Sequence, residues 1–67
     1  MNESMMIEVD VLIRSAEGVV AAIDNVLKRF DNAENDVDYR SRVEMCYAKR
    51  VAEDHLASLR QFAEDFS

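Results

Sequence analysis

The side chains that could perform covalent or acid–base chemistry are few. Cys46 is the only cysteine, His55 is the only histidine, and the other candidates are scattered carboxylates. On one helix, nine residues place the thiol and the imidazole about 13 Å apart, so the pair would need two chains to meet. We expect a free thiol on a helix surface and a buried or half-buried histidine. The sequence therefore predicts no catalytic site and no enzyme.

Metal and phosphate sites are not indicated either. One cysteine and one histidine do not complete a structural zinc site. A di-iron site in a helix bundle needs a glutamate three residues before a histidine, and here Ala52 precedes His55 at that spacing. A single glycine, Gly18, cannot build a phosphate-binding loop of backbone amides. We therefore predict no metal and no cofactor.

One group of side chains differs from an ordinary solvated helix face. Helical spacing gathers five residues on one side of the second predicted helix, namely Tyr39, Val43, Cys46, Tyr47 and Arg50. Arg42 and Lys49 border this group. Tyrosine and arginine are enriched at protein-binding hot spots. The pattern predicts a partner-binding site made of Tyr39, Arg42, Val43, Tyr47 and Arg50. Two other interpretations stay open, namely burial of this side in an oligomer and stacking of the tyrosines on a nucleotide base.

Long helices must position these side chains, because the chain has no proline and one glycine. Apolar residues of the first helix recur in alternating steps of four and three, which is a heptad pattern. A second apolar row lies beside the first and widens the face, which suits a bundle core better than a two-stranded coiled coil. The first row is Met5, Val9, Leu12, Ala16, Val19, Ile23, Val26 and Phe30, and the second is Met6, Ile13, Val20 and Leu27.

The predicted fold is all-α, an antiparallel two-helix hairpin that forms a single domain over residues 1–67. The first helix is expected at about 4–30, a polar loop at about 31–36, and the second helix at about 37–66. Lys28 and Arg29 favour a helix C-terminus, and Asn35, Asp36 and Asp38 favour the next N-terminus. The second helix carries its core face at Met45, Ala48, Ala52, His55, Leu56, Leu59, Phe62, Ala63 and Phe66.

Opposite charges four residues apart should support both helices by a few tenths of a kcal/mol each. The predicted pairs are Asp10–Arg14, Asp24–Lys28, Asp36–Arg40, Asp38–Arg42, Lys49–Glu53, Arg50–Asp54 and Arg60–Glu64.

A hairpin of this size should associate with another chain. A 67-residue domain buries only about 60% of its unfolded surface, and one cysteine cannot form an internal disulfide. We expect the row Met6, Ile13, Val20 and Leu27 to face water in a lone hairpin, and its full burial would contribute roughly 1.5 to 3 kcal/mol for each side chain. Two hairpins in an antiparallel four-helix bundle would bury it, so we predict a homodimer. The predicted self-association core is Met6, Leu12, Ile13, Val19, Val20, Ile23, Leu27, Phe30, Leu56, Leu59 and Phe62.

Charge and hydropathy narrow the classes of partner. Fourteen acidic and eight basic side chains give a net charge of -6, which disfavours general binding to nucleic acids and anionic lipids. No apolar run reaches the roughly 18 residues of a membrane span, and no secretory signal is apparent, so we expect a cytoplasmic protein. The sequence favours a non-enzymatic module that binds itself and masks or inhibits a larger, unidentified partner protein, for example as a phage-type inhibitor of a host system. An assembly or secretion chaperone, a purely structural oligomer and a nucleotide-sequestering binder remain open.

Overall fold

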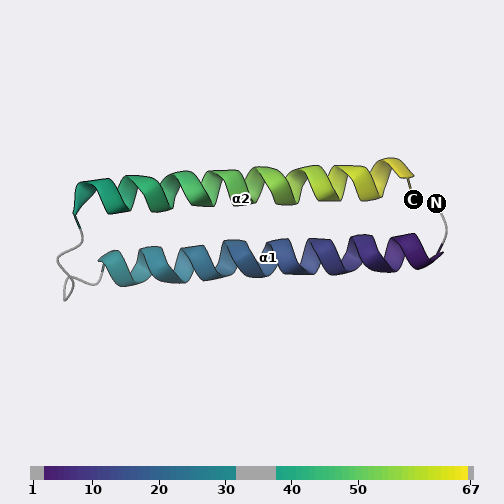
Figure 1. The fold of residues 1–67 in the computed structure, drawn as a ribbon, viewed down its shortest axis with the longest axis horizontal. Helices are drawn as coiled ribbons and strands as arrows, with labels where there is room; N and C mark the ends of the chain where they lie inside the picture. The colour runs from purple at the N-terminus through teal and green to yellow at the C-terminus, as the bar shows by residue number, and fades with distance from the viewer. Residues whose placement is uncertain (1–2, 32–37, 67) are drawn as a thin grey trace.

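The structure, a computed structural model, describes residues 3–31 and 38–66 and consists there of two α-helices. α1 spans Glu3–Asp31 and α2 spans Tyr39–Phe66, and they run antiparallel side by side along their whole length (Figure 1). The predicted all-helical hairpin is thus confirmed, with helix ends within two residues of the expected ones. Most of the loop predicted at 31–36 lies outside the described residues, as do Asn35, Asp36 and the predicted Asp36–Arg40 pair.

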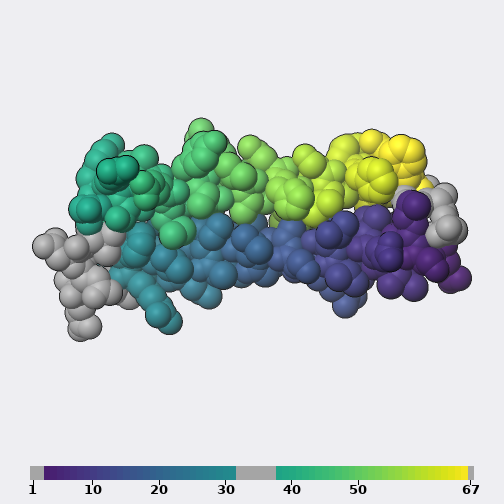
Figure 2. All heavy atoms as spheres, in the orientation of Figure 1, coloured from purple at the N-terminus to yellow at the C-terminus, as the bar shows by residue number. Residues whose placement is uncertain are grey.

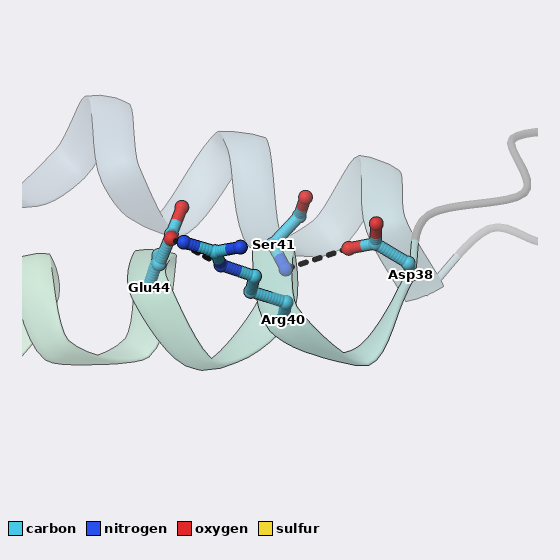
Figure 3. A network of polar contacts seen from close by, with 4 residues as sticks. All are labelled: Asp38, Arg40, Ser41 and Glu44. Carbon is cyan, nitrogen blue, oxygen red and sulfur yellow. Dashed lines mark hydrogen bonds and ion pairs between the residues drawn. The ribbon is translucent and has the colours of Figure 1, made fainter.

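Polar side chains stabilise the two helix ends that face the connection. The carboxylate of Asp38 accepts a 2.8 Å hydrogen bond from the backbone N–H of Ser41, which makes Asp38 the N-cap of α2 (Figure 3). Arg42 donates a 2.6 Å hydrogen bond to the carbonyl oxygen of Phe30, one of the last carbonyls of α1 and so without a partner within its own helix. The predicted role of Asp38 as a cap is confirmed, and Arg42 caps the other helix.

The core between the helices is thin. Among the described residues only Val9, Ala16 and Leu56 are buried. Side chains of both helices meet along the length of the hairpin (Figure 2), but most apolar ones remain half-buried or exposed. Such a layer covers one stripe of each helix, and the apolar side chains beside that stripe are only partly covered.

The expectation about which apolar row faces water was wrong. Met6, Ile13, Val20 and Leu27 are half-buried beside α2. The row on the other flank of the buried stripe is the exposed one, and it consists of Met5, Leu12 and Val19, with exposed fractions of 46, 51 and 52%. The exposed apolar row of the hairpin therefore lies on the opposite flank of α1 from the one expected.

Candidate functional site

Ion pairs close one side of the hairpin. Lys49 Nζ lies 2.7 Å from Asp24 Oδ1, and both side chains are half-buried. Two further pairs join the helices, with N–O distances of 3.1 and 3.3 Å: Arg42–Asp31 and Arg60–Glu17. We call these six residues the ion-pair side. Each pair adds little stability, since exposed ion pairs contribute between 0 and 1 kcal/mol, but all three join the same flank of α1 to the same flank of α2.

These contacts correct the predicted charge pairs. Within α1, Asp10–Arg14 is confirmed at 3.1 Å. Asp24, however, bonds to Lys49 of α2 rather than to Lys28, and Arg42 bonds to Asp31 rather than to the carboxylate of Asp38. Lys49 and Arg60 also reach across to α1, where they pair with Asp24 and Glu17. Arg40 pairs with Glu44 along α2 at 3.3 Å (Figure 3).

The Asp24–Lys49 pair affects protonation. The hydrogen bond that Lys49 donates to Asp24, followed by the negative charge of Asp24, raises the pKa of Lys49 above the ordinary 10.5. A raised pKa means that folding favours the charged ammonium. The stabilising contribution is therefore fully present below pH 10.5 and is lost as the pH rises through the higher pKa of the folded state.

The opposite side of the hairpin is open and apolar. Two shallow hollows, with predominantly apolar linings, lie along it and share Val19, Ala52 and His55. Val51 and Phe62 fall on the same stripe of α2 as His55, and they are 49 and 42% exposed. We call this side the open face. It consists of the larger side chains of the hollows and of this stripe that are exposed or half-buried, namely Leu12, Val19, Ile23, Tyr47, Val51, His55 and Phe62.

Helix geometry shows that the two sides are separate. Val19 and Asp24 are five residues apart, which is roughly 140° around α1, and the buried stripe containing Ala16 lies between their rows. On α2, Lys49 and Val51 are likewise about 160° apart. The hairpin therefore presents one face closed by charges and, across the helix interface, one face whose apolar side chains are exposed or half-buried.

The accessible area is larger than a compact chain of this mass would have. A folded monomer of 7.7 kDa exposes about 4,300 Å², whereas this hairpin exposes 5400 Å². The excess is about 1,100 Å², and a standard protein–protein interface covers about 800 Å² on each partner. The excess reflects the elongated shape of the hairpin, which measures 49 by 15 by 11 Å.

The predicted partner-binding residues lie partly together and partly elsewhere. Tyr39, Tyr47 and Val43 are 82, 69 and 47% exposed, and Arg50 is exposed beside them. Val43, Cys46, Tyr47 and Arg50 line one shallow hollow. Arg42 is half-buried and holds Asp31 and Phe30. We define the tyrosine surface as Tyr39, Val43, Cys46, Tyr47 and Arg50; Tyr47 also borders the open face.

Most basic side chains near the tyrosine surface form ion pairs, and this affects whether the surface could bind a nucleotide. Arg42 and Lys49 both bond to carboxylates of α1. Arg40 is paired with Glu44. The tyrosine surface thus offers Arg50 as its main cation, which is little for binding phosphates. An interface with a protein, where one arginine beside two tyrosines is a common hot-spot composition, fits these residues better.

Cys46 and His55 lie on opposite sides of α2. Nine residues turn the helix through 900°, which is half a turn beyond two full ones. Cys46 is an exposed free thiol, as expected. His55 is exposed on the open face, so the expectation of a buried or half-buried histidine was wrong.

The described residues hold no group of three or more His, Cys, Asp or Glu side chains placed to bind a metal ion. Neither helix, over the ranges described, contains a stretch long and apolar enough to cross a membrane. No protein-family model, curated protein or solved structure matches the chain.

The two-sided character of the hairpin was not predicted, although the sequence contains a signal for it. Glu17, Asp24 and Asp31 recur every seven residues in α1, and Arg42 and Lys49 are also seven residues apart in α2. In an antiparallel hairpin, an acidic heptad row on one helix and a basic one on the other bring opposite charges together at successive levels. Charged residues four positions away within each helix compete with these partners on the other helix, which is why the longer-range pattern is hard to recognise in the sequence.

Proposed function

We propose that the chain is a non-enzymatic protein-interaction module, a self-associating helical hairpin that binds and masks a larger partner protein. One observation carries the proposal. The ion pairs between the helices occupy one side, while Leu12, Val19, Val51 and Phe62 are about half exposed on the other. Apolar rows at heptad spacing pack well against other helices.

The surface area supports a second copy as one occupant. The hairpin has about 1,100 Å² more accessible area than a compact chain of its mass, and its buried core consists of three residues among those described. A homodimer with the open faces together would form a four-helix bundle and would place Val19 and Val51 in a core. Self-association would thereby compensate for the thin interior.

The tyrosine surface supports a second, different partner. Tyr39 is 82% exposed, and Arg50 adds a cation next to Tyr47. Large aromatic side chains with so much free surface gain substantially when a partner covers them. A module that covers a functional surface of its partner acts as an inhibitor, which is the role we favour.

Affinity capture from a lysate, followed by mass spectrometry, tests the partner-binding role. A Tyr39→Ala, Tyr47→Ala and Arg50→Ala triple variant should lose captured proteins that the natural chain retains. A matched control is available on the outer side of α1, where two exposed apolar residues and an arginine can be replaced in the same way: Ile7, Val11 and Arg14. Identical proteins captured by both triple variants would exclude the tyrosine surface as the binding site.

A further inference from the structure

We infer that a second copy covers the open face with its connection at the opposite end, so that a two-fold axis passes close to Val19 and His55. This inference rests on the self-association proposed above. Two hairpins packed face to face with two-fold symmetry have only two arrangements. With the axis parallel to the helices, both connections lie at one end and α1 packs on α2 of the second copy. With the axis across the helices, the connections lie at opposite ends, α1 packs on α1 and α2 on α2.

The position of the axis follows from the lengths of the helices. Val19 and His55 line the same two hollows, so they lie at one level of the hairpin. That level is close to the middle of both Glu3–Asp31 and Tyr39–Phe66. An axis there overlaps the two open faces over their full length, and the covered area is then largest.

Side-chain size favours connections at opposite ends. Leu12 lies seven residues before Val19 and Phe62 seven residues after His55, and because the helices are antiparallel both lie toward the same end of the hairpin. With connections at one end, Leu12 would face Phe62 of the second copy, and two large side chains would compete for one space. With connections at opposite ends, Phe62 faces Ala48, its counterpart seven residues before His55. Large residues opposite small ones interdigitate, as close packing requires.

Tyr47 lies eight residues before His55 and so about 80° from it around α2, at the outer edge of the open face. This position leaves the rest of the tyrosine surface, including Tyr39, outside the dimer contact.

Charge points to the same arrangement. The half of the hairpin that contains residues 3–18 and 56–66 has six acidic and two basic side chains, a net charge of -4. The other half, residues 20–54, has eight acidic and six basic side chains, a net charge of -2. With both connections at one end, the two more acidic halves would lie together and repel each other. With opposite ends, each more acidic half lies against the less acidic half, which contains six of the eight cations.

Disulfide trapping distinguishes the two arrangements. In a Cys46→Ser background, which removes the native thiol, the single variants Val19→Cys and His55→Cys are oxidised with glutathione disulfide, separately and as a mixture. We expect each variant to form a covalent dimer with itself, and we expect no mixed species in the mass spectrum. Leu12→Cys is the matched control on the same face; it faces Val26 of the second copy and should remain unlinked.

The outcomes separate this inference from the proposal on which it rests. A mixed disulfide between Val19→Cys and His55→Cys chains, without self-linked ones, would show connections at one end and overturn the inference while leaving the dimer intact. Dimers by sedimentation that link no faster at residue 19 or 55 than at residue 12 would also overturn it. Variants that sediment as single chains, together with a natural chain that does the same, would remove the self-association itself.

Discussion

Shortening Leu12 to alanine should weaken self-association and leave the hairpin folded. Leu12 is 51% exposed, so the hairpin covers about half of it and a second copy would cover the rest. The substitution removes three carbons, worth about 0.8 kcal/mol each at full burial. Half of that sum is about 1.2 kcal/mol per copy, or about 2.4 kcal/mol per dimer. The dissociation constant should therefore rise about 50-fold.

A matched control is Ile7→Ala. Ile7 is 63% exposed, lies roughly 140° from Leu12 around α1, and also loses three carbons on truncation to alanine. Because alanine favours helix at least as well as leucine or isoleucine, neither substitution should reduce helix content through propensity. The control therefore changes exposed apolar area without changing the open face.

Sedimentation equilibrium over a range of concentrations measures both variants, and circular dichroism monitors their helix content. Leu12→Ala should require about 50-fold higher concentration for half-dimerisation, while Ile7→Ala should match the natural chain. Equal shifts in the two variants would refute the assignment of the interface to the open face. A loss of helicity confined to Leu12→Ala would instead place Leu12 in the core of the single hairpin.

Three further substitutions test other contacts. Gly18→Ala should raise the free energy of unfolding by about 0.5 to 1 kcal/mol, measured by urea denaturation, because Gly18 lies inside α1 with no atom within 4 Å of an added Cβ. Asp38→Ala should lower Tm at neutral pH. The hydrogen bonds that Asp38 accepts from the backbone N–H and then the hydroxyl of Ser41 lower the pKa of Asp38. The contribution of Asp38 to stability is therefore full above the ordinary pKa of 3.8 and is lost as the pH falls through the lower pKa of the folded state. The Tm values of the variant and the natural chain should converge at that low pH. Lys49→Met should lower Tm at pH 7, and this difference should shrink above pH 10.5, where the natural chain loses the charge that bonds to Asp24.

The helices and their ends followed from local properties of the sequence. Heptad spacing, the lack of proline and the cap at Asp38 depend on residues within a few positions of each other, and the structure agrees with them to within two residues. These signals act through the geometry of a single helix, so no knowledge of the partner helix is needed to interpret them.

The orientation of the helices about their own axes could not be derived in the same way. Apolar rows flank the stripe of Val9 and Ala16 on both sides, and either flank could have turned toward α2. The choice depends on contacts between distant residues, such as Asp24 with Lys49, and these compete with partners four residues away. For this reason the exposed row and the position of His55 were predicted incorrectly, and so were the charge partners of Asp24 and Arg42.

A single helix determines most of the predicted tyrosine surface, and contacts between the helices determine the position of Arg42. Tyr39, Val43, Tyr47 and Arg50 were placed together because they share one side of a single helix, and the structure keeps them exposed there. Arg42 was grouped with them by the same spacing. Its long side chain instead turns to Asp31 and the end of α1, an interaction that only the folded hairpin provides.

The mass of the natural chain in solution tests the central claim most directly. Sedimentation equilibrium at neutral pH should give the mass of two 7.7 kDa chains, falling toward that of one chain on dilution. A helical protein that sediments as a single chain at every concentration would contradict the account, because the open face would then remain in water without a second copy to cover it.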